Sequence, residues 1–498
     1  MKHLKKIVSL LLTAVMVLAM CIPVMADDVA TAAKKYTITA PATNHIYEIY
    51  QIFTGDLNNG VLSNVKWGEN GTGTRDTAVD ESVLNALVAI KDSTSDREKL
   101  NVVENYAKLD IAPIATVTNS STYEANPGYY LIKDQDDSVN GLDAYTTYIV
   151  RVVGDVTIQA KSSVPSFEKK LKDTNDTTGA TSGWQDSADY DIGDKIPFQL
   201  KGTVASNYDD YKTYYFAFHD KEEAALTFDA SSVVVKVDDT KITSGYEVKT
   251  SGKTHNDCTF EVIFKNLKDI TSVHAGSVIT VEYESTLNDT AKLGAEGNVN
   301  EAKLEFSNNP NEEQNGEDKP GTGETPWDNV IVFTYKVVIN KLNENKVPLA
   351  GAEFTLSKKL ADGSTVAVAV VKSNSGTTFT FSGLDDGDYT LTETKTPDEY
   401  NTIAPITFTV TADHKITWDS GNRETILTKL NGNKVSGEIT FTHDESEGSL
   451  SADVVNKKGS SLPSTGGIGT TIFYVVGVIL MLGAGVLLVT KKRMSSNR

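Results

Sequence analysis

The sequence predicts an all-β protein made of tandem β-sandwich domains. Runs rich in Val, Ile, Thr, Tyr and Phe recur along the chain, and clusters of Gly, Asn, Asp and Pro separate them. Short alternating runs between such clusters are typical of sandwich strands, and long amphipathic helical repeats are scarce. The predicted strands include residues 36–40, 145–153, 233–237, 278–283, 332–341 and 406–411. The main predicted helix is 81–91, where Val83, Leu84, Leu87, Val88 and Ile90 have helical spacing.

The N-terminal 26 residues predict a secretory signal peptide. Lys2, Lys5 and Lys6 precede an apolar run over residues 7–24, and the run ends at a short cleavage-type segment closing with Ala26. A basic start, an apolar middle and a cleavage site define such a segment, which is removed from the mature protein and takes no part in the fold.

The C-terminal end combines a short peptide motif with a predicted transmembrane helix. The motif, Leu462-Pro463-Ser464-Thr465-Gly466, is followed by an apolar run of 23 residues, 468–490, and then by a basic tail. A helix needs about 20 apolar residues to cross a bilayer, and basic residues stay on the cytoplasmic side. A plain membrane anchor would explain the run and the tail but would leave the motif without a role.

Charge and cysteine content narrow the class of protein. Seven of the 47 basic residues lie in the two ends that are predicted to be removed, so the mature chain carries 40 basic and 67 acidic residues, a net charge of −27. A strongly acidic chain argues against nucleic-acid binding. Cys21 lies in the signal peptide and leaves Cys258 alone, so no intrachain disulfide reinforces the domains.

Composition divides the chain into three predicted domains. A first boundary falls at 160–165, where serines and a proline interrupt two strand-like runs. A second falls at 308–326, which is rich in Asn, Glu, Gly and Pro and reads as a linker. The expected domains are therefore 27–160, 161–320 and 326–458, followed by a short stalk and the C-terminal segment 462–498.

In the third predicted domain, a lysine, a glutamate and an asparagine are expected to face one apolar core. Lys341 is separated by an even number of positions from Val337 and Ile339 in one predicted strand, so the three share one parity. Glu393 has the same relation to Tyr389 and Leu391 in another strand. Period-two alternation puts residues of one parity on the same face. Asn456 lies two positions from Val454 in the last predicted strand. An alternative is that Lys341 lies at an edge and Glu393 in solvent, since lysine is almost never fully buried unless paired.

Such a buried set can perform chemistry on itself. Burial lowers the pKa of a lysine and raises that of a glutamate, because both charged forms are disfavoured. A neutral amine is a nucleophile, and a protonated carboxyl group can polarise an amide and relay protons. The product is a Lys341–Asn456 isopeptide bond with loss of ammonia, assisted by Glu393 in a single turnover.

The second predicted domain has a similar constellation. In the first strand of this domain, Lys169 shares parity with its apolar neighbours. Asn308 shares parity with apolar residues at the far end of the domain, and Asp220 lies between the two in the sequence. Lys170 and Asn309 are the alternatives shifted by one residue, and they are disfavoured because such a shift turns a side chain to the opposite face.

Three segments resemble parts of Gram-positive surface pilins. The Tyr-x-Leu-x-Glu-Thr run at 389–394 resembles the E-box of Cna B-type domains, although Glu399 stands where that family often has Gly. The run 184–194 and the strand that follows it resemble the fimbrial isopeptide-forming domain, and the C-terminal segment resembles an LPXTG cell-wall sorting signal. The resemblance implies Ig-like (Cna-type) sandwiches and a Lys169–Asn308 bond assisted by Asp220.

The resemblance also implies a sortase reaction. In this family a sortase recognises Leu462 and Pro463 within the motif, cleaves between Thr465 and Gly466, and joins the threonine carbonyl to an amine. In backbone pilins the amine is a lysine just before the second domain. Lys161 occupies that place here, although Gln159, Ala160 and Ser162 replace the usual Tyr, Pro and Asn around it.

The leading hypothesis is therefore a backbone pilin displayed on a Gram-positive cell wall. The expected partners are a class C pilus sortase, identical subunits, minor pilins, and peptidoglycan reached through a housekeeping sortase. The alternative is a monomeric wall-anchored adhesin or minor tip or base pilin that binds host extracellular matrix. A wall-anchored enzyme is disfavoured, because the histidines are scattered singly and no Cys/His cluster has zinc spacing; no cofactor or metal is expected.

Overall fold

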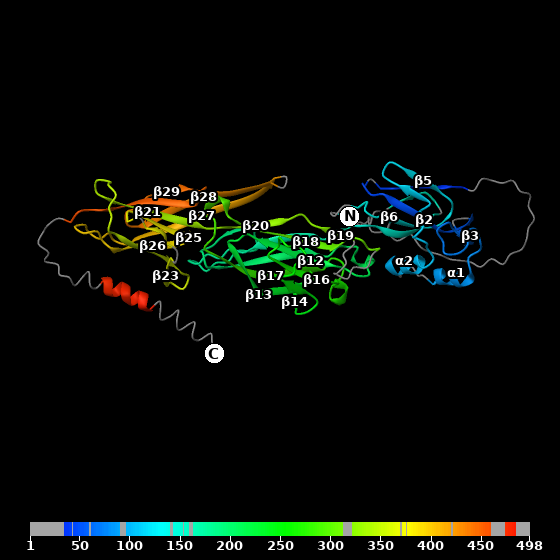
Figure 1. Ribbon diagram of the computed structural model, residues 1–498, viewed down its shortest axis with the longest axis horizontal. Helices are drawn as coiled ribbons and strands as arrows, with labels where there is room; N and C mark the ends of the chain where they lie inside the picture. The colour runs from blue at the N-terminus through cyan, green and yellow to red at the C-terminus, as the bar shows by residue number, and fades with distance from the viewer. Residues whose placement is uncertain are drawn as a thin grey trace, which may run out of the picture.

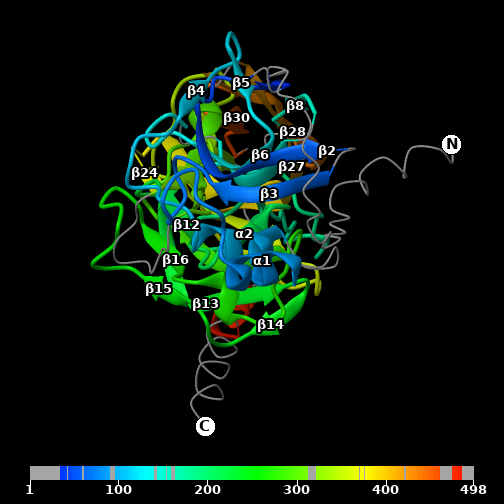
Figure 2. The same ribbon diagram turned by 90° about the vertical axis from the view of Figure 1, so that its right-hand side faces the viewer.

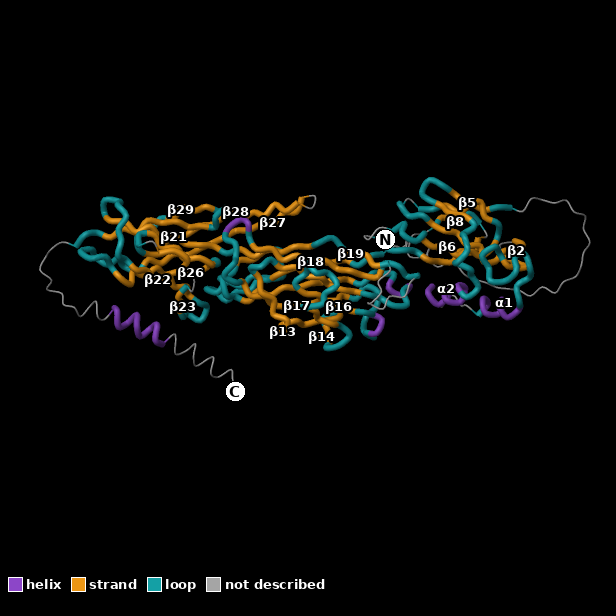
Figure 3. The backbone as a smooth tube through the Cα atoms, in the orientation of Figure 1, coloured by secondary structure: helices purple, strands orange, loops and turns teal. Residues whose placement is uncertain are grey.

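The computed structural model describes residues 34–459, apart from short gaps at 42, 59–60, 90–95, 140–142, 153, 159–162, 312–320, 369–370, 375 and 420–421, together with residues 474–484. Strands dominate, and three bodies follow one another along the longest axis of the molecule (Figures 1 and 3). The all-β prediction is confirmed for the described residues.

Domain 1 pairs two small sheets and carries two short helices. Its sheets have the orders β5-β1-β8 and β3-β2-β6-β7, and β4 also pairs with β2. The elements are β1 Tyr36–Thr39, β2 Tyr47–Asn58, β3 Val61–Trp67, α1 Glu81–Val88, α2 Asp96–Glu104, β4 Ala115–Val117, β5 Thr122–Ala125, β6 Gly128–Asp134, β7 Thr147–Val152 and β8 Val156–Thr157. Figure 2, which faces domain 1, shows α1 and α2 beside the β2–β3 hairpin. There Val83 and Leu100 pack against Phe53 in a second small core.

Domain 2 is a sandwich of two larger sheets. One has the order β10-β20-β18-β12-β16-β15, with β19 beside β18, and the other the order β14-β13-β17-β11-β9. The strands are β9 Ser166–Leu171, β10 Ser187–Asp189, β11 Lys195–Thr203, β12 Phe216–Glu222, β13 Leu226–Val237, β14 Thr240–Ile242, β15 Glu247–Lys249, β16 Phe260–Phe264, β17 Val278–Leu287, β18 Asn298–Ser307, β19 Thr322–Glu324 and β20 Asp328–Phe333, with short 3₁₀ turns at Tyr208–Asp210, Leu267–Asp269 and Gly294–Glu296.

Domain 3 is a sandwich whose first and last strands lie side by side. Its sheets have the orders β24-β25-β21-β30-β29 and β23-β22-β26-β27-β28. Strands β21 and β30 run parallel, with Lys341 opposite Val454. The strands are β21 Tyr335–Asn343, β22 Glu353–Lys359, β23 Thr365–Ala367, β24 Val371–Asn374, β25 Thr378–Leu384, β26 Gly387–Lys395, β27 Ile406–Asp419, β28 Asn422–Ser436, β29 Phe441–Asp444 and β30 Ser449–Asn456.

The second domain boundary differs from the predicted one. The segment 308–326 is not a linker between domains, because β20 follows it and pairs with β18 and β10 inside domain 2. The predicted strand 332–341 is therefore two strands, and the change of domain falls at Thr334 between them. The polar composition of this segment suggested a linker, but β19 lies within it and the apolar β20 that follows completes a sheet of domain 2. The sequence also missed helix α2.

The predicted terminal segments lie largely beyond the described residues. The signal peptide 1–26 and the sorting motif are outside them, as are most residues of the predicted span 468–490. Residues 474–484 are helical. Within the described part of the chain, none of the helices has the length and apolar character that crossing a membrane requires. The transmembrane helix thus stays a prediction.

Domains 2 and 3 meet at a joint that is both apolar and charged. Val299, Ile331 and Phe333 from domain 2 belong to the apolar core cluster of domain 3. The long β27–β28 hairpin extends towards domain 2 (Figure 1), where the Nδ1 atom of His414 lies 2.7 Å from the Ser187 hydroxyl. Such contacts on two sides restrict rotation at the joint.

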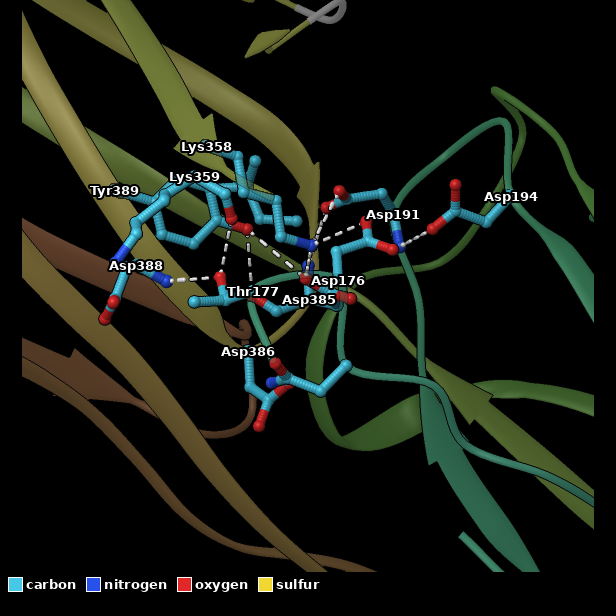
Figure 4. Close-up of polar contacts among 12 residues, drawn as sticks. Asp176, Thr177, Asp191, Asp194, Lys358, Lys359, Asp385, Asp386, Asp388 and Tyr389 are labelled. Atoms are coloured by element: carbon cyan, nitrogen blue, oxygen red, sulfur yellow. Dashed lines mark hydrogen bonds and ion pairs between the residues drawn. The ribbon is translucent and has the colours of Figure 1, made fainter. Parts of the chain in front are cut away.

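The centre of the joint is the ammonium group of Lys358, surrounded by carboxylates (Figure 4). Lys358 is 1% exposed, and its Nζ lies 3.1 Å from Asp176, 2.9 Å from Asp191 and in contact with Asp385. The backbone N–H of Asp385 donates to the other oxygen of Asp191 at 2.9 Å. Burial lowers the pKa of Lys358, but Asp385 and Asp191 outweigh that effect and raise it above its ordinary value. Lys358 therefore stays charged and bridges the two domains.

Replacing Lys358 should loosen this joint. Lys358→Ala leaves buried carboxylates without a counter-charge, which typically costs about 3–5 kcal/mol. We expect a lower unfolding temperature and a less extended small-angle scattering profile. Lys359→Ala is the matched control, because the neighbouring Lys359 is exposed. Equal unfolding temperatures and scattering profiles for the two variants would contradict the role of Lys358.

Candidate functional site

In domain 3 the structure brings the three predicted residues together. Lys341 lies on β21 and Asn456 on the adjacent β30, while Glu393 comes from β26 in the opposite sheet. The three side chains are 0%, 0% and 5% exposed, so they meet inside the sandwich. Parity placed all three correctly, because each strand has one face on the core.

The contacts of this group suit acyl transfer to the lysine. The Nζ of Lys341 lies 2.5 Å from the Oδ1 of Asn456. The Nδ2 of Asn456 donates to the two oxygens of Glu393 at 2.9 and 3.1 Å. Burial lowers the pKa of Lys341 from 10.5 to about 8. The neutral form of the amine is therefore far more populated near neutral pH than in an ordinary lysine, and a carboxyl group faces the nitrogen that would leave.

Domain 2 contains a second buried lysine beside an acid. Lys169 and Asp220 are both fully buried and in direct contact. The hydroxyl of Tyr283 accepts from the Lys169 Nζ at 2.8 Å and donates to Asp220 at 2.7 Å. Burial lowers the pKa of Lys169 and raises that of Asp220. The predicted pair of amine and assisting acid is thus present.

The predicted partner of Lys169 was wrong. Asn308 lies beyond the end of β18, where its Nδ2 donates to the backbone carbonyl of Asp143 in domain 1 at 3.1 Å. Asp220 pairs with Ala302 on β18, so Asn308, six positions further on, is roughly 20 Å away along the strand. Asn308 instead helps to join domains 1 and 2.

Asn300 occupies the place that was assigned to Asn308. It is fully buried, and its Nδ2 donates to the Tyr283 hydroxyl at 2.9 Å and to Glu222 at 3.3 Å. Lys169 and Asn300 therefore share the Tyr283 hydroxyl. Burial raises the pKa of Glu222 to about 8, so this second acid is largely protonated at neutral pH. Alternation along the strand could not distinguish Asn300 from Asn308, because both positions have the same parity. Only the register of β18 against its neighbour shows which of the two lies near Asp220.

The alternatives shifted by one residue are not at the site either. Lys170 is partly exposed and pairs with Asp186. Asn309 is buried, but its Oδ1 accepts from the backbone N–H of Asn311 at 3.1 Å. Lys170 follows Lys169 on β9 and so faces the opposite side of the sheet, and Asn309 lies beyond the end of β18.

Lys161 and the sorting motif Leu462–Gly466 lie outside the described residues. Their roles remain predictions. A set of acidic residues at the joint, Asp176, Asp191, Asp194 and Asp385, has the spacing of a metal site. The ammonium of Lys358 supplies the positive charge there.

Two protein-family models match parts of the chain. Residues 335–424 match the SpaA domain, described as a prealbumin-like fold domain. Residues 454–496 match the LPXTG cell wall anchor motif. The first match covers most of domain 3, including Lys341 and Glu393, and the second covers the predicted sorting signal.

The chain is also similar to a streptococcal surface protein over most of its length. It is 27% identical over 399 residues to the trypsin-resistant surface T6 protein of Streptococcus pyogenes serotype M6, which covers 67% of this chain and 70% of that protein. The solved structure of the T6 backbone pilin from the same serotype, described as a modular three-domain structure, aligns with a TM-score of 0.52 and 19% identity. The alignment covers 86% of this chain and 98% of that one. At that identity the structural match supports the fold alone.

A free amine at Lys341 should make stability depend on pH. Its pKa is about 8 in the folded state and 10.5 ordinarily, so between these values the unfolded state binds more protons and stability rises with pH. In Glu393→Gln, which removes the assisting acid, the free energy of unfolding should increase by up to roughly 3 kcal/mol over that range.

Urea unfolding at a series of pH values measures this gain. The control is the double variant Glu393→Gln with Lys341→Met, which lacks the amine and should lack the gain. Parallel pH profiles for the two variants would show that Lys341 keeps its ordinary pKa.

Proposed function

We propose that this chain is a cell-wall-anchored backbone pilin of a Gram-positive surface pilus and that it is polymerised covalently through Thr465 and Lys161. A sortase of the pilus class would cleave between Thr465 and Gly466 and join the threonine carbonyl to Lys161 of the next identical subunit. The match of residues 454–496 to the LPXTG anchor motif supports the donor end. Minor pilins and a housekeeping sortase acting on peptidoglycan are the further expected partners.

The position of Lys161 between domains 1 and 2 supports it as the acceptor. It follows β8, the last strand of domain 1, and precedes β9, the first of domain 2. The T6 backbone pilin, which supports the fold, is likewise described as having three domains. Thr465 follows domain 3 in the sequence, whereas Lys161 precedes domain 2. A bond from Thr465 of one subunit to Lys161 of the next would therefore link subunits head to tail.

We further propose that domains 2 and 3 each form an internal isopeptide bond. In domain 3 the neutral Lys341 amine attacks the Cγ of Asn456, a C–N bond forms and the Cγ–Nδ2 bond breaks. A proton from the amine passes through Glu393 to the leaving nitrogen, and ammonia departs. The contact of Glu393 with Nδ2 is the observation that carries this proposal.

In domain 2 the corresponding bond would join Lys169 to Asn300, with Asp220 as the acid beside the amine. Glu222 contacts the Asn300 nitrogen that would leave, and its pKa of about 8 leaves it a proton to give at neutral pH. The hydroxyl oxygen of Tyr283 accepts hydrogen bonds from both the Lys169 amine and the Asn300 amide, and so holds the two groups near each other.

These crosslinks suit a fibre that bears tension without disulfides. The Lys341–Asn456 bond closes a loop of 115 residues, and a crosslink of that span adds roughly 4–5 kcal/mol by restricting the unfolded chain. Force that enters β21 would reach β30 through a covalent bond instead of through a hydrogen-bond ladder.

Intact mass tests both internal bonds. Purified residues 27–460 should be lighter than the sequence by two ammonia molecules, and Glu393→Ala or Asn300→Ala should each restore one. Asn308→Ala is the matched control for the second domain and should keep both losses. An unchanged deficit in Asn300→Ala, with one ammonia restored in Asn308→Ala, would return the bond to Asn308.

Coexpression with the cognate sortase tests polymerisation. Boiled samples on a denaturing gel should give a high-mass ladder that Lys161→Ala abolishes, because no acceptor amine remains. Lys35→Ala, which removes an exposed lysine of domain 1, should keep the ladder. A ladder that survives Lys161→Ala would exclude this acceptor, and monomers under all conditions would favour the single-subunit adhesin.

A further inference from the structure

The outer face of one domain 2 sheet carries a second buried group of ionisable side chains. His219 lies on β12, opposite Glu261 on β16, and Glu305 lies on the other neighbour, β18. His219 and Glu261 are fully buried and Glu305 is 4% exposed. Because neighbours in a strand alternate, His219 faces away from the core into which Asp220 points. The proposed isopeptide chemistry therefore does not use this group.

The imidazole of His219 is held between two carboxylates. Its Nδ1 lies 3.1 Å from Glu261 and its Nε2 lies 3.1 Å from Glu305. Glu261 also accepts from the backbone N–H groups of Thr254 and His255 at 2.8 and 2.7 Å, which fixes it as an acceptor and makes Nδ1 the donor. In a neutral ring, the unprotonated Nε2 would then direct its lone pair at the carboxylate oxygen of Glu305. Either a proton, carried by the ring or by Glu305, or a metal ion must lie between them.

His255 lies beside this pair, and Glu324 lies beside His255. The Nε2 of His255 lies 3.8 Å from Glu305 and 3.5 Å from Glu324. Glu324 is directly opposite Glu305 across the β18–β19 pair. Lys303 pairs with one oxygen of Glu324 at 2.5 Å, and the other oxygen faces His255.

We propose that His219, His255, Glu305 and Glu324 form a zinc-binding site. Zinc takes imidazole nitrogen and carboxylate oxygen ligands at about 2.0–2.2 Å in a tetrahedron, so neighbouring ligand atoms lie roughly 3.3 Å apart. The separations of 3.1 and 3.8 Å from Glu305 to His219 and His255 match that spacing, and these three residues form one candidate metal group. Glu324, 3.5 Å from His255, would move in to complete the tetrahedron when the ion binds.

The surroundings of the group also fit zinc. Glu261 bound to Nδ1 of His219 is the outer carboxylate that commonly orients a zinc-binding histidine. Two neutral imidazoles and two carboxylates balance the charge of one Zn²⁺, whereas Ca²⁺ and Mg²⁺ prefer oxygen ligands alone. His255 is 28% exposed, which gives the ion a route from solvent.

Sequence spacing could not reveal this site. The four ligands lie on β12, on the loop before β16, on β18 and on β19, and only the sheet register brings them together. Bound zinc would tie that loop and the short β19 to the sheet. A second set, His219, Cys258 and Glu261, lies on the Nδ1 side of the ring. There Glu261 already accepts two backbone hydrogen bonds, so we assign the metal to the Nε2 side.

Calorimetric titration of ZnCl₂ into the metal-stripped protein tests the proposal, with bound zinc counted after gel filtration. We expect one zinc per chain, retained in the presence of excess Ca²⁺ and Mg²⁺. His255→Ala and Glu324→Gln, both outside the fully buried part, should each weaken binding at least tenfold. His274→Ala, which removes a histidine that is 71% exposed, should leave binding unchanged. Thermal unfolding without zinc should be the same for His255→Ala and the unaltered chain, which separates loss of a ligand from loss of the fold.

Absence of stoichiometric zinc would overturn the proposal and leave a proton between His219 and Glu305. Equal affinity in His255→Ala and the unaltered protein would do the same. Loss of zinc in Cys258→Ser with full retention in His255→Ala would place the metal on the other side of the ring and refute the ligands named here.

Discussion

The rest of the structure depends on strand pairing that buries a lysine next to an amide and an acid. In domain 3 the parallel pairing of β21 and β30 places Lys341 and Asn456 on one inner face, and the opposite sheet supplies Glu393. In domain 2 Lys169 meets Asp220 and, through Tyr283, Asn300. Burial in a sandwich makes the amine less basic, and an unpaired lysine in a core is costly. Formation of an amide would remove that cost and fix the strands that created it.

Burial of a lysine is not enough to favour amide formation, as Lys358 illustrates. It is as buried as Lys341, but it contacts three carboxylates and has no amide partner within the joint. Its pKa is raised, whereas that of Lys341 is lowered to about 8. The number of carboxylates therefore separates a charged bridge between domains from a nucleophile within one. Lys358 holds domains 2 and 3 together by electrostatics, and the proposed amide at Lys341 would hold the strands of domain 3 by a covalent bond.

Sequence predicted the fold class and the site in domain 3 because both follow from period-two alternation. Lys341, Glu393 and Asn456 could be placed on the core face by parity, and the run at 389–394 contains Glu393. Glu399, which replaces the usual glycine, has a φ of 73°, the left-handed conformation that glycine favours. Where register matters, parity was insufficient: Asn308 and Asn300 are equivalent by alternation, and the zinc ligands are spread over more than a hundred residues. The boundary at Thr334 was missed because a segment of polar composition precedes the last strand of domain 2.

Stretching single molecules between their ends tests the central claim most directly. If both bonds are present, force bypasses residues 170–299 and 342–455, so domains 2 and 3 release none of that length, and only domain 1 and the segments outside the bonds extend. Unfolding steps that release either hidden segment in the unaltered protein would contradict a covalent connection between Lys169 and Asn300 or between Lys341 and Asn456.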